Sequence, residues 1–419
     1  MSIPVPLPRV AAFEKLGFGL FVHWGLYSQI GEGEWVQRLH HYDGEEYAKL
    51  QNTFTAEDFD AEELARFAHD CGIRYIVLTT RHHDGFSLYD TCGLNDYDAP
   101  HSPAKRDLVA EFVAGCRKYD VVPFFYHTTI DWHWHGKHTK EMPEDEFQEY
   151  LDYLIDSVEI LCRNYGKIGG LWFDGNWARP QSDWQEDRLY GMIRKYQPDA
   201  IIVNNSGLEA LGKEGHPELD SVTFENNVAR PMNRDGKSKY IAAEVCRTMN
   251  HHWGRSCGDF DFMSPGKAIE LLSHSRGCGA NFLLNIGPDA QGAVPDYERA
   301  LLTIVGKWCK LNGEALYRPV PASFNCKGRD FMLRDGKNYY YFVFEMGVRG
   351  DDNVTAMARG LGTRCIDNFS EEVISAEWLD NGETVPFFQD LTTGALAVQC
   401  AGYRYGHNLV VRVMKLVCR

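Results

Sequence analysis

Residues 18–25, FGLFVHWG, and 75–86, YIVLTTRHHDGF, decide how this chain folds, together with 121–132, VVPFFYHTTIDW, and 169–175, GGLWFDG. Each stretch is a short run of apolar, β-branched or aromatic residues that is followed at once by His, Asp or Trp and a turn. Evenly spaced buried strands with polar groups at their carboxyl ends are typical of (β/α)8 barrel enzymes, which build their active sites at that end. The four stretches therefore predict an α/β fold, a TIM-like (β/α)8 barrel, and a set of candidate catalytic residues.

The rest of the first three quarters of the chain continues the alternation of strand and helix. Strand-like runs follow at 200–205, 221–226, 240–247 and 280–288, which brings the expected number of strands to eight. Apolar residues with helical spacing occur at 60–72, 107–120, 146–166, 183–198, 264–279 and 295–316. This order predicts parallel βαβ units. We therefore expect a catalytic barrel domain over residues 1–317.

The pattern changes after residue 317. Apolar and polar residues alternate, with Asp-Gly and Asn-Gly turns, in the segments 329–336, 338–347, 372–390, 395–400 and 408–416. Such alternation with tight turns is typical of antiparallel sheets. The sequence therefore predicts a C-terminal antiparallel β-sandwich domain over residues 318–419.

Composition limits the partners of the chain. The formal net charge is −16, which argues against nucleic acid or an anionic membrane as the main partner because both favour Lys and Arg patches. No apolar run approaches the roughly 20 residues that span a bilayer. Aromatic residues make up 13% of the chain, and although most should fill the barrel core, such rings also form stacking faces for sugars. A neutral small-molecule or glycan substrate fits best, and a homo-oligomer stays open.

The twelve cysteines are scattered singly, without a CxxC pair or metal-ligand spacing. Several cysteines fall on expected helices, where they would serve as small buried apolar side chains. We therefore expect no structural disulfides. The N-terminal residues, MSIPVPLPRVAAFEK, lack the basic and apolar regions of a signal peptide. We expect a cytoplasmic protein, with a secreted protein that has been trimmed as the alternative.

Asp174 is the strongest candidate for a catalytic residue. It follows Leu-Trp-Phe at the end of the fourth strand and precedes Gly-Asn-Trp, which places it among aromatic rings at the active end of the barrel. A carboxylate that stays ionised there can stabilise or attack a developing positive charge. An Asp that only caps a strand end is the plainer alternative.

Glycoside hydrolysis needs a second carboxyl group on another strand, because in retaining enzymes the pair is about 5–5.5 Å apart. Glu225 closes the sixth strand, Glu244 lies in the seventh, and Glu34 lies in the loop after the first. Spacing alone does not separate these three residues.

Histidines are numerous at the expected strand ends. His23 ends the first strand, His82 and His83 end the second, and His127 lies in the third. A metal-dependent hydrolase is therefore an alternative, but the His-x-His pattern that opens zinc hydrolases of this fold is absent from the first strand. Neutral histidines can equally bind sugar hydroxyls. We expect no metal and no other cofactor.

These segments resemble the α-L-fucosidases of glycoside hydrolase family 29. The similarity is carried by HWGLYS followed by EW, by LTTRHHDGF, by LWFDG and by NFLLNIGPDAQG, in the order of that family. It runs through the whole barrel, and the C-terminal segment fits the family's accessory β-sandwich. The resemblance implies a retaining, exo-acting α-L-fucosidase without metal or cofactor, acting on a fucosylated glycan.

The resemblance also implies roles for individual residues. Asp174 of LWFDG matches the nucleophile, and Glu225 of DSVTFE matches the acid/base in the form D-x-x-T-x-E. Glu244 is the backup, because the acid/base differs in parts of the family. The residues that would hold the fucose are His23, Glu34, Trp35, His82, His83, Tyr126 and Trp253.

One position departs from the family pattern. Relatives often carry an Arg after the strand-five Asn, where this chain has Ser206. Either another cation such as Arg230 replaces it, or the sugar or aglycone is held differently. A non-catalytic sugar-binding protein is the second alternative to a fucosidase, and it would lack a competent second carboxylate.

Overall fold

The computed structural model describes residues 2–348 and 362–419 of the 419-residue chain. The chain forms two compact units, one made of Met1–Met263 and Asn281–Leu301 and the other of Ser264–Ala280 and Leu302–Arg419. The boundary expected at residue 317 stays a prediction, since the compact units are interleaved in sequence. In the described part of the chain, no helix has the length and apolar character needed to cross a membrane.

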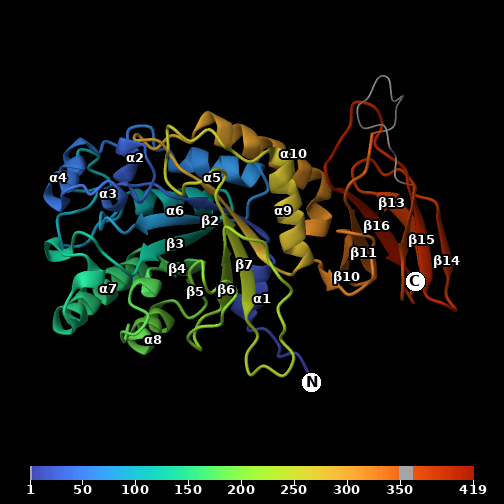
Figure 1. Cartoon of the computed structure of the whole chain (residues 1–419), viewed down its shortest axis with the longest axis horizontal. Helices are drawn as coiled ribbons and strands as arrows, with labels where there is room; N and C mark the ends of the chain where they lie inside the picture. The colour runs from blue at the N-terminus through green and yellow to red at the C-terminus, as the bar shows by residue number, and fades with distance from the viewer. Residues whose placement is uncertain (1, 349–361) are drawn as a thin grey trace. The chain divides into compact units, whose positions relative to one another are not determined.

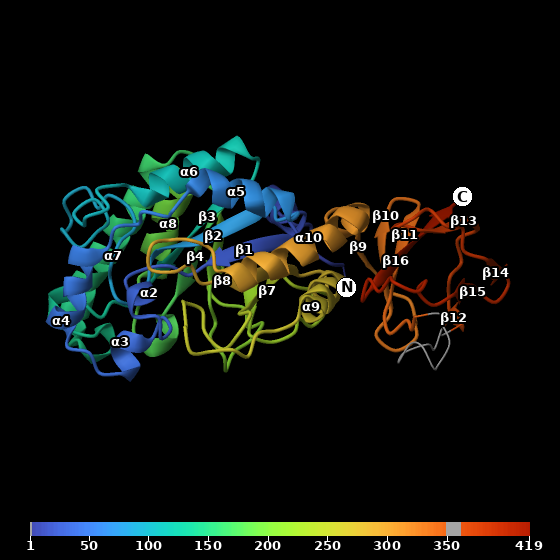
Figure 2. The ribbon, with the colours of Figure 1, turned by 90° about the horizontal axis from the view of Figure 1, so that it is seen from above.

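Eight parallel strands close into a barrel in chain order, and β1 pairs with β8 to complete it. Figure 1 labels β2 to β7, and Figure 2 labels β1 and β8. The strands are β1 (Phe18–Val22), β2 (Tyr75–Arg81), β3 (Val122–Thr128), β4 (Gly170–Asp174), β5 (Ile201–Asn204), β6 (Ser221–Glu225), β7 (Ala242–Arg247) and β8 (Asn281–Ile286). They are nearly continuous apolar runs because parallel strands are covered on both faces. The predicted barrel and its eight strands are confirmed.

Helices follow most strands along the chain. The longer ones are α1 (Pro8–Glu14), α5 (Ala61–Asp70), α6 (Leu108–Lys118), α7 (Glu144–Asn164), α8 (Glu186–Tyr196), α9 (Pro265–Gly277) and α10 (Asp296–Leu316). Of these, α5, α6, α7 and α8 lie around the outside of the barrel (Figures 1 and 2). Short helical turns fill the loops, at α2 (Tyr27–Ile30), α3 (Val36–Leu39), α4 (Gly44–Ala48), η1 (Lys49–Thr53), η2 (Trp134–Gly136), η3 (Thr139–Glu141) and η4 (Asn176–Ala178). All six predicted helices are present, and α1 is an addition.

The connections after β5 and β6 contain no helix, although the structure describes every residue of 205–220 and 226–241. The fold is therefore an incomplete (β/α)8 barrel on that side. These long loops are free to contribute side chains to the carboxyl end of the barrel.

The amino end of the barrel is closed by α1. Val10 and Phe13 of this helix join the buried cluster formed by inward-facing strand residues such as Tyr75, Phe124 and Ile201. Burial of large aromatic side chains supplies much of the free energy that holds such a core together.

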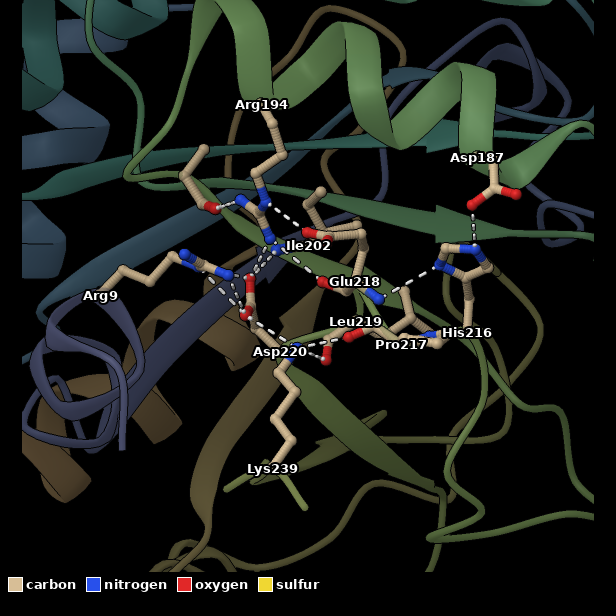
Figure 3. Close-up of polar contacts among 11 residues, drawn as sticks. Arg9, Asp187, Arg194, Ile202, His216, Pro217, Glu218, Leu219, Asp220 and Lys239 are labelled. Carbon is tan, nitrogen blue, oxygen red and sulfur yellow. Dashed lines mark hydrogen bonds and ion pairs between the residues drawn. The ribbon is translucent and has the colours of Figure 1, made fainter. Parts of the chain in front are cut away.

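A buried carboxylate fastens several elements at the same end. Asp220, directly before β6, is fully buried and lies between Arg9 of α1, Arg194 of α8 and Lys239 (Figure 3). The Nε of Arg9 is 3.1 Å from both carboxylate oxygens, Nη2 of Arg194 is 2.7 Å from Oδ2, and Nζ of Lys239 is 3.6 Å from Oδ1. The backbone N–H of Ile202 also donates to Oδ2, at 3.1 Å. Asp220 is thus neutralised by three cations.

The C-terminal strands form two antiparallel sheets. One has the order β13-β16-β11-β10-β9 and the other β12-β15-β14. Their bounds are β9 (Val320–Ala322), β10 (Phe331–Asp335), β11 (Asn338–Val343), β12 (Gly362–Ile366), β13 (Val373–Trp378), β14 (Phe387–Asp390), β15 (Ala395–Cys400) and β16 (Arg412–Cys418). Buried residues of both sheets, among them Tyr341, Met414, Ile366 and Val398, share one core. The predicted β-sandwich is confirmed.

Candidate active site

A cavity of about 790 Å³ lies at the carboxyl end of the barrel strands. Its wall combines strand ends with the loops that follow β1, β4, β5, β6 and β7. The lining residues include Phe21, His23, Glu34, Trp35, His82, His83, Tyr126, Trp172, Asp174, Trp177, Asn205, Ser206, Leu208, Lys213, Glu225, Asn226, His251 and Trp253. Nine of the ten residues singled out in the sequence therefore meet in one cavity, and Glu244 is the exception.

Asp174 ends β4 and keeps 15% of its side chain exposed. Its Oδ1 accepts a hydrogen bond from Nε1 of Trp177 at 2.7 Å and one from Nδ2 of Asn205 at 3.2 Å. Its Oδ2 accepts the hydroxyl of Tyr126 at 3.1 Å and lies 3.5 Å from Nε2 of His83. Burial alone would raise the pKa of Asp174, but His83 and the Trp177 and Asn205 donors outweigh burial and hold that pKa below its ordinary value. The carboxylate is kept ionised by donors that favour its charged form.

Glu225 ends β6 and shares a donor with Asp174. The Nδ2 of Asn205 is 2.7 Å from Glu225 Oε2 and 3.2 Å from Asp174 Oδ1. The two carboxylate oxygens can therefore be no more than about 6 Å apart, which suits the close carboxyl pair of a retaining glycosidase rather than the wider pair of an inverting one. Burial and the charge of Asp174 raise the pKa of Glu225 to about 7, against hydrogen bonds from Asn205 and Trp253 that lower it.

Glu244 lies below the cavity rather than on its wall. In the pairing of β6 with β7, Glu244 is opposite Thr223, whereas Glu225 is opposite Cys246. Glu244 is thus two residues, or about 6–7 Å, deeper in the barrel than Glu225. It is 1% exposed, and it accepts hydrogen bonds from the Tyr75 hydroxyl at 2.5 Å and from Nε1 of Trp172 at 2.8 Å.

The pKa does not distinguish the two glutamates. Burial also raises the pKa of Glu244 to about 7, opposed by its hydrogen bonds from Tyr75 and Trp172. The distinction is one of access, because only Glu225 reaches the cavity.

Two histidines on the cavity wall have lowered pKa values, which favour the neutral imidazole. Burial lowers the pKa of His23 to about 3, although the hydrogen bond to Asn285 raises it, and the His23 Nδ1 lies 2.6 Å from the Asn285 Oδ1. Burial, His83 and His23 together hold the pKa of His82 well below its usual range. Within the described part of the chain, the buried Nδ1 of His82 has no hydrogen-bond partner. Such an atom is available to a hydroxyl of a bound molecule.

Aromatic rings and Glu34 complete the wall. Trp35 stacks on Trp177 with ring centroids 5.9 Å apart, and Trp253 packs against His23 at 5.0 Å. Glu34 Oε2 accepts the backbone N–H groups of Trp253 and Gly254 at 3.0 and 2.9 Å. It therefore ties the loop after β1 to the loop after β7.

Sequence reasoning missed two residues that contact Asp174. Trp177 and Asn205 donate to it, and Asn205 also contacts Glu225. Trp177 lies three residues after the fourth expected strand, in the run DGNW, and Asn205 is the last residue of the fifth, in VNN, so their positions alone could have marked them as candidates. The bridging role of Asn205 needs the barrel to bring β4, β5 and β6 together.

The departure at Ser206 has a structural counterpart. Ser206 lines the cavity, and its backbone N and side-chain Oγ each lie 3.3 Å from the Oγ1 of Thr223. Arg230, the cation suggested as a substitute, is exposed and is absent from the described cavity wall, whereas Lys213 lies on that wall. Among the described residues, no group of three or more His, Cys, Asp and Glu is arranged to hold a metal ion.

Two carboxyl groups side by side in a barrel mouth, one with its pKa lowered by donors and one with its pKa raised by burial to about 7, place the chain among the barrel-fold glycoside hydrolases. The family profile described as alpha-L-fucosidase matches residues 6–314. Tissue alpha-L-fucosidase of Rattus norvegicus is 30% identical over 355 residues, which cover 75% of this chain and 71% of that protein. The chain belongs to the alpha-L-fucosidase family.

Solved structures show the same fold. Alpha-L-fucosidase isoenzyme 1 from Paenibacillus thiaminolyticus is 28% identical, with a TM-score of 0.82 over 98% of this chain and 99% of that one. A GH29 alpha-L-fucosidase from Bacteroides thetaiotaomicron, described as a trapped covalent intermediate, is 22% identical with a TM-score of 0.82 over 100% of this chain and 98% of that one. The family resemblance predicted from the sequence is confirmed.

Proposed function

We propose that this protein is an exo-acting, retaining α-L-fucosidase that removes terminal α-L-fucose from fucosylated oligosaccharides or glycoconjugates. The observation that carries the proposal is the pair Asp174 and Glu225, which share the amide of Asn205 and whose pKa values are shifted in opposite directions. Family membership favours this activity over a metal-dependent hydrolase or a non-catalytic sugar-binding protein.

In the first step, the ionised Asp174 attacks the anomeric carbon while protonated Glu225 gives its proton to the departing glycosidic oxygen. The bond from carbon to oxygen breaks as an ester between fucose and Asp174 forms. In the second step, Glu225, now a carboxylate, takes a proton from water as the water oxygen attacks the same carbon. Asp174 leaves as a carboxylate, and both side chains return to their starting states.

The electrostatics of the pair suit these two roles. A nucleophile must be ionised, which agrees with the lowered pKa of Asp174, and a general acid must hold its proton near neutral pH, which agrees with a pKa of about 7 at Glu225. When Asp174 becomes an ester, its negative charge disappears, and the pKa of Glu225 should fall so that it can act as a base.

The surrounding residues are proposed to hold the sugar. His23, His82, His83, Tyr126 and Glu34 provide donors and acceptors for hydroxyl groups, and the neutral state of His23 and His82 suits an uncharged sugar. Trp35 and Trp253 offer apolar faces for the ring and the methyl group of fucose. We propose no metal or other cofactor in this reaction.

We infer a cytoplasmic location for the enzyme. All twelve cysteines are free thiols, and several of them are buried in the barrel. Free thiols are typical of proteins kept in a reducing compartment.

The proposal is tested with an aryl α-L-fucoside. We expect the wild type to hydrolyse it with α-L-fucose as the first product seen by proton NMR, as retention requires. The Asp174→Gly enzyme should be nearly inactive and regain activity with azide, which replaces the carboxylate. Inactivity of the wild type toward α-L-fucosides, or near-normal turnover of Asp174→Gly without azide, would overturn the proposal.

A further inference from the structure

Two further hollows adjoin the active cavity on the same unit of the protein, as their shared lining residues show. The nearer hollow, of about 380 Å³, shares Asn226 and His251 with the active cavity. The outer hollow, of about 430 Å³, shares Phe262 with the nearer one. We call the two hollows together the outer groove. Its walls come from the ends of β6 and β7, from the loop 248–263, and from residues 289–297 at and before the start of α10.

We propose that the outer groove binds the part of the substrate glycan that lies beyond the fucose, so that the enzyme recognises an oligosaccharide of several neutral sugars. The proposal rests on the proposed fucosidase function for its substrate. The link to that function is adjacency, because Asn226 and His251 line both the nearer hollow and the cavity that would hold the fucose.

The chemistry of the outer hollow suits sugar rings. Phe260 is 87% exposed and Tyr297 is 44% exposed, and the ring of Tyr297 lies 4.7 Å from that of Phe262, centroid to centroid. Aromatic faces pack against the C–H surfaces of sugars, while the Arg255 guanidinium and the Asp296 carboxylate beside them can bind hydroxyls. Exposing an apolar ring such as Phe260 to water is unfavourable, and exposed apolar surface beside a hollow often marks a binding site.

The loop that contains Phe260 is fixed by side-chain hydrogen bonds. Asp259 accepts the backbone N–H groups of His251 and Asp261 at 2.9 and 3.0 Å, and it contacts the rings of His251 and His252 at 3.2 and 3.0 Å. These contacts hold Asp259 in place and tie the start of the segment, at His251 and His252, to its end at Asp261, next to Phe260. A preformed platform loses less entropy on binding than a flexible one.

The charge of the outer groove selects among glycans. Its walls carry Asp259, Asp261, Asp289 and Asp296 against Arg247 and Arg255. A surplus of carboxylates repels anionic groups. We therefore expect neutral chains of hexose and N-acetylhexosamine to bind and sialylated chains to be disfavoured.

The test uses the intact enzyme and the neutral tetrasaccharide lacto-N-tetraose, which contains no fucose. Saturation-transfer NMR should detect weak binding to the wild type, and Phe260→Ala should weaken it at least fivefold while Phe260→Tyr restores it. Phe388→Ala is the matched control, because Phe388 of β14 is also highly exposed, at 71%, and is not part of the groove. A sialylated tetrasaccharide should bind less than the neutral one.

A kinetic arm separates this proposal from the proposed function. With an aryl α-L-fucoside, Phe260→Ala should match the wild type within twofold, whereas kcat/KM for a fucosylated lacto-N-tetraose should fall at least fivefold, mainly through KM. Absence of tetrasaccharide binding to the wild type, or equal behaviour of Phe260→Ala and Phe388→Ala in both arms, would overturn the groove even if the aryl fucoside is hydrolysed. Loss of fucosidase activity in the wild type would instead overturn the function, while tetrasaccharide binding sensitive to Phe260→Ala would still support the groove.

Discussion

Asp220 and Asp174 are largely buried carboxylates at opposite ends of one barrel, and they are stabilised in different ways. At the amino end, Asp220 is in contact with Arg9, Arg194 and Lys239 and has no exposed surface. At the carboxyl end, Asp174 is held by an indole, an amide, a phenol and an imidazole, and it faces the cavity. Both groups are fixed, but only one is accessible.

The difference indicates what each end of the barrel does. A carboxylate surrounded by guanidinium and ammonium groups is neutralised and sterically covered, so it can join elements but cannot attack a substrate. Hydrogen-bond donors that carry no positive charge also keep a carboxylate ionised, but they do not cancel its charge. That charge can then stabilise a positive centre that develops on the substrate. The residues at the amino end of the barrel therefore stabilise the fold, and those at the carboxyl end form the active site, as is usual in (β/α)8 barrels.

The largest expected effects come from neutralising each carboxylate in turn. Asp174→Asn should lower kcat by about 10⁴-fold or more, because the nucleophile is removed, with little change in thermal unfolding. Asp220→Asn should do the reverse and cost about 3–5 kcal/mol of stability, because three cations lose their counter-charge, while the folded enzyme keeps its kcat. Steady-state kinetics and thermal unfolding of both variants test the pair. Equal loss of activity in the two folded variants would contradict the division between the ends.

The next effect concerns the two candidate acids. Glu225→Gln should reduce turnover of natural glycosides by about 10²–10⁴-fold, because their leaving groups need a proton. With an activated aryl leaving group, kcat/KM should fall much less, because it reports the first step, whereas kcat should stay low because Glu225 is also the base of the second step. Glu244→Gln should show no such dependence on the leaving group, since Glu244 is held below the cavity by Tyr75 and Trp172. Kinetics across a series of leaving groups distinguishes the two, and a steep dependence in Glu244→Gln would reverse the assignment.

A smaller effect is expected in the pH profile. Activity needs Asp174 ionised and Glu225 protonated, so kcat/KM of the wild type should fall as pH rises through about 7, where Glu225 loses its proton. Asn205→Ala removes a donor that favours the charged forms of both carboxylates, so both pKa values should rise and the alkaline limb should move to higher pH by about 0.5–1 unit.

Asn204→Ala is the control for this shift, because the Asn204 amide donates to the hydroxyl of Tyr190 and contacts neither carboxylate. Its pH profile should match that of the wild type. A shift of the Asn205→Ala profile to lower pH would contradict the bridging role.

The smallest effect is expected from Trp177→Phe, which keeps an aromatic ring but removes the N–H that donates to Asp174. One lost hydrogen bond of about 1 kcal/mol corresponds to a decrease in kcat of roughly fivefold. Trp132→Phe is the control, since the buried Nε1 of Trp132 has no hydrogen-bond partner in the described part of the chain. Similar kinetics for both variants would show that the Trp177 donor does not matter.

Much of the fold could be predicted from the sequence because the strands are buried on both faces and read as short apolar runs. Asp174 could be proposed because a carboxylate directly after such a run must lie at the barrel mouth. The choice between Glu225 and Glu244 did not follow from the residue pattern, because it depends on the pairing register that sets Glu244 two residues deeper.

Other features depend on contacts between distant segments. The bridge through Asn205 needs three strands to be neighbours, and the cations around Asp220 come from α1, α8 and the segment before β7. Phe260 lies next to Asp259, whose side-chain contacts with His251 and Asp261 are not visible as a motif. Local sequence predicts elements and strand ends, whereas long-range contacts decide which side chains meet.

We expect Asp174, and no other carboxylate, to form the covalent bond to the sugar. An activated 2-deoxy-2-fluoro fucoside slows the second step, so the intermediate accumulates and can be located by peptide mass mapping. We predict one fucosyl adduct per active site on the peptide that contains Asp174, and on Asp174 itself after fragmentation. An adduct on Glu225 or Glu244, or turnover that proceeds through inversion without any adduct, would contradict the account.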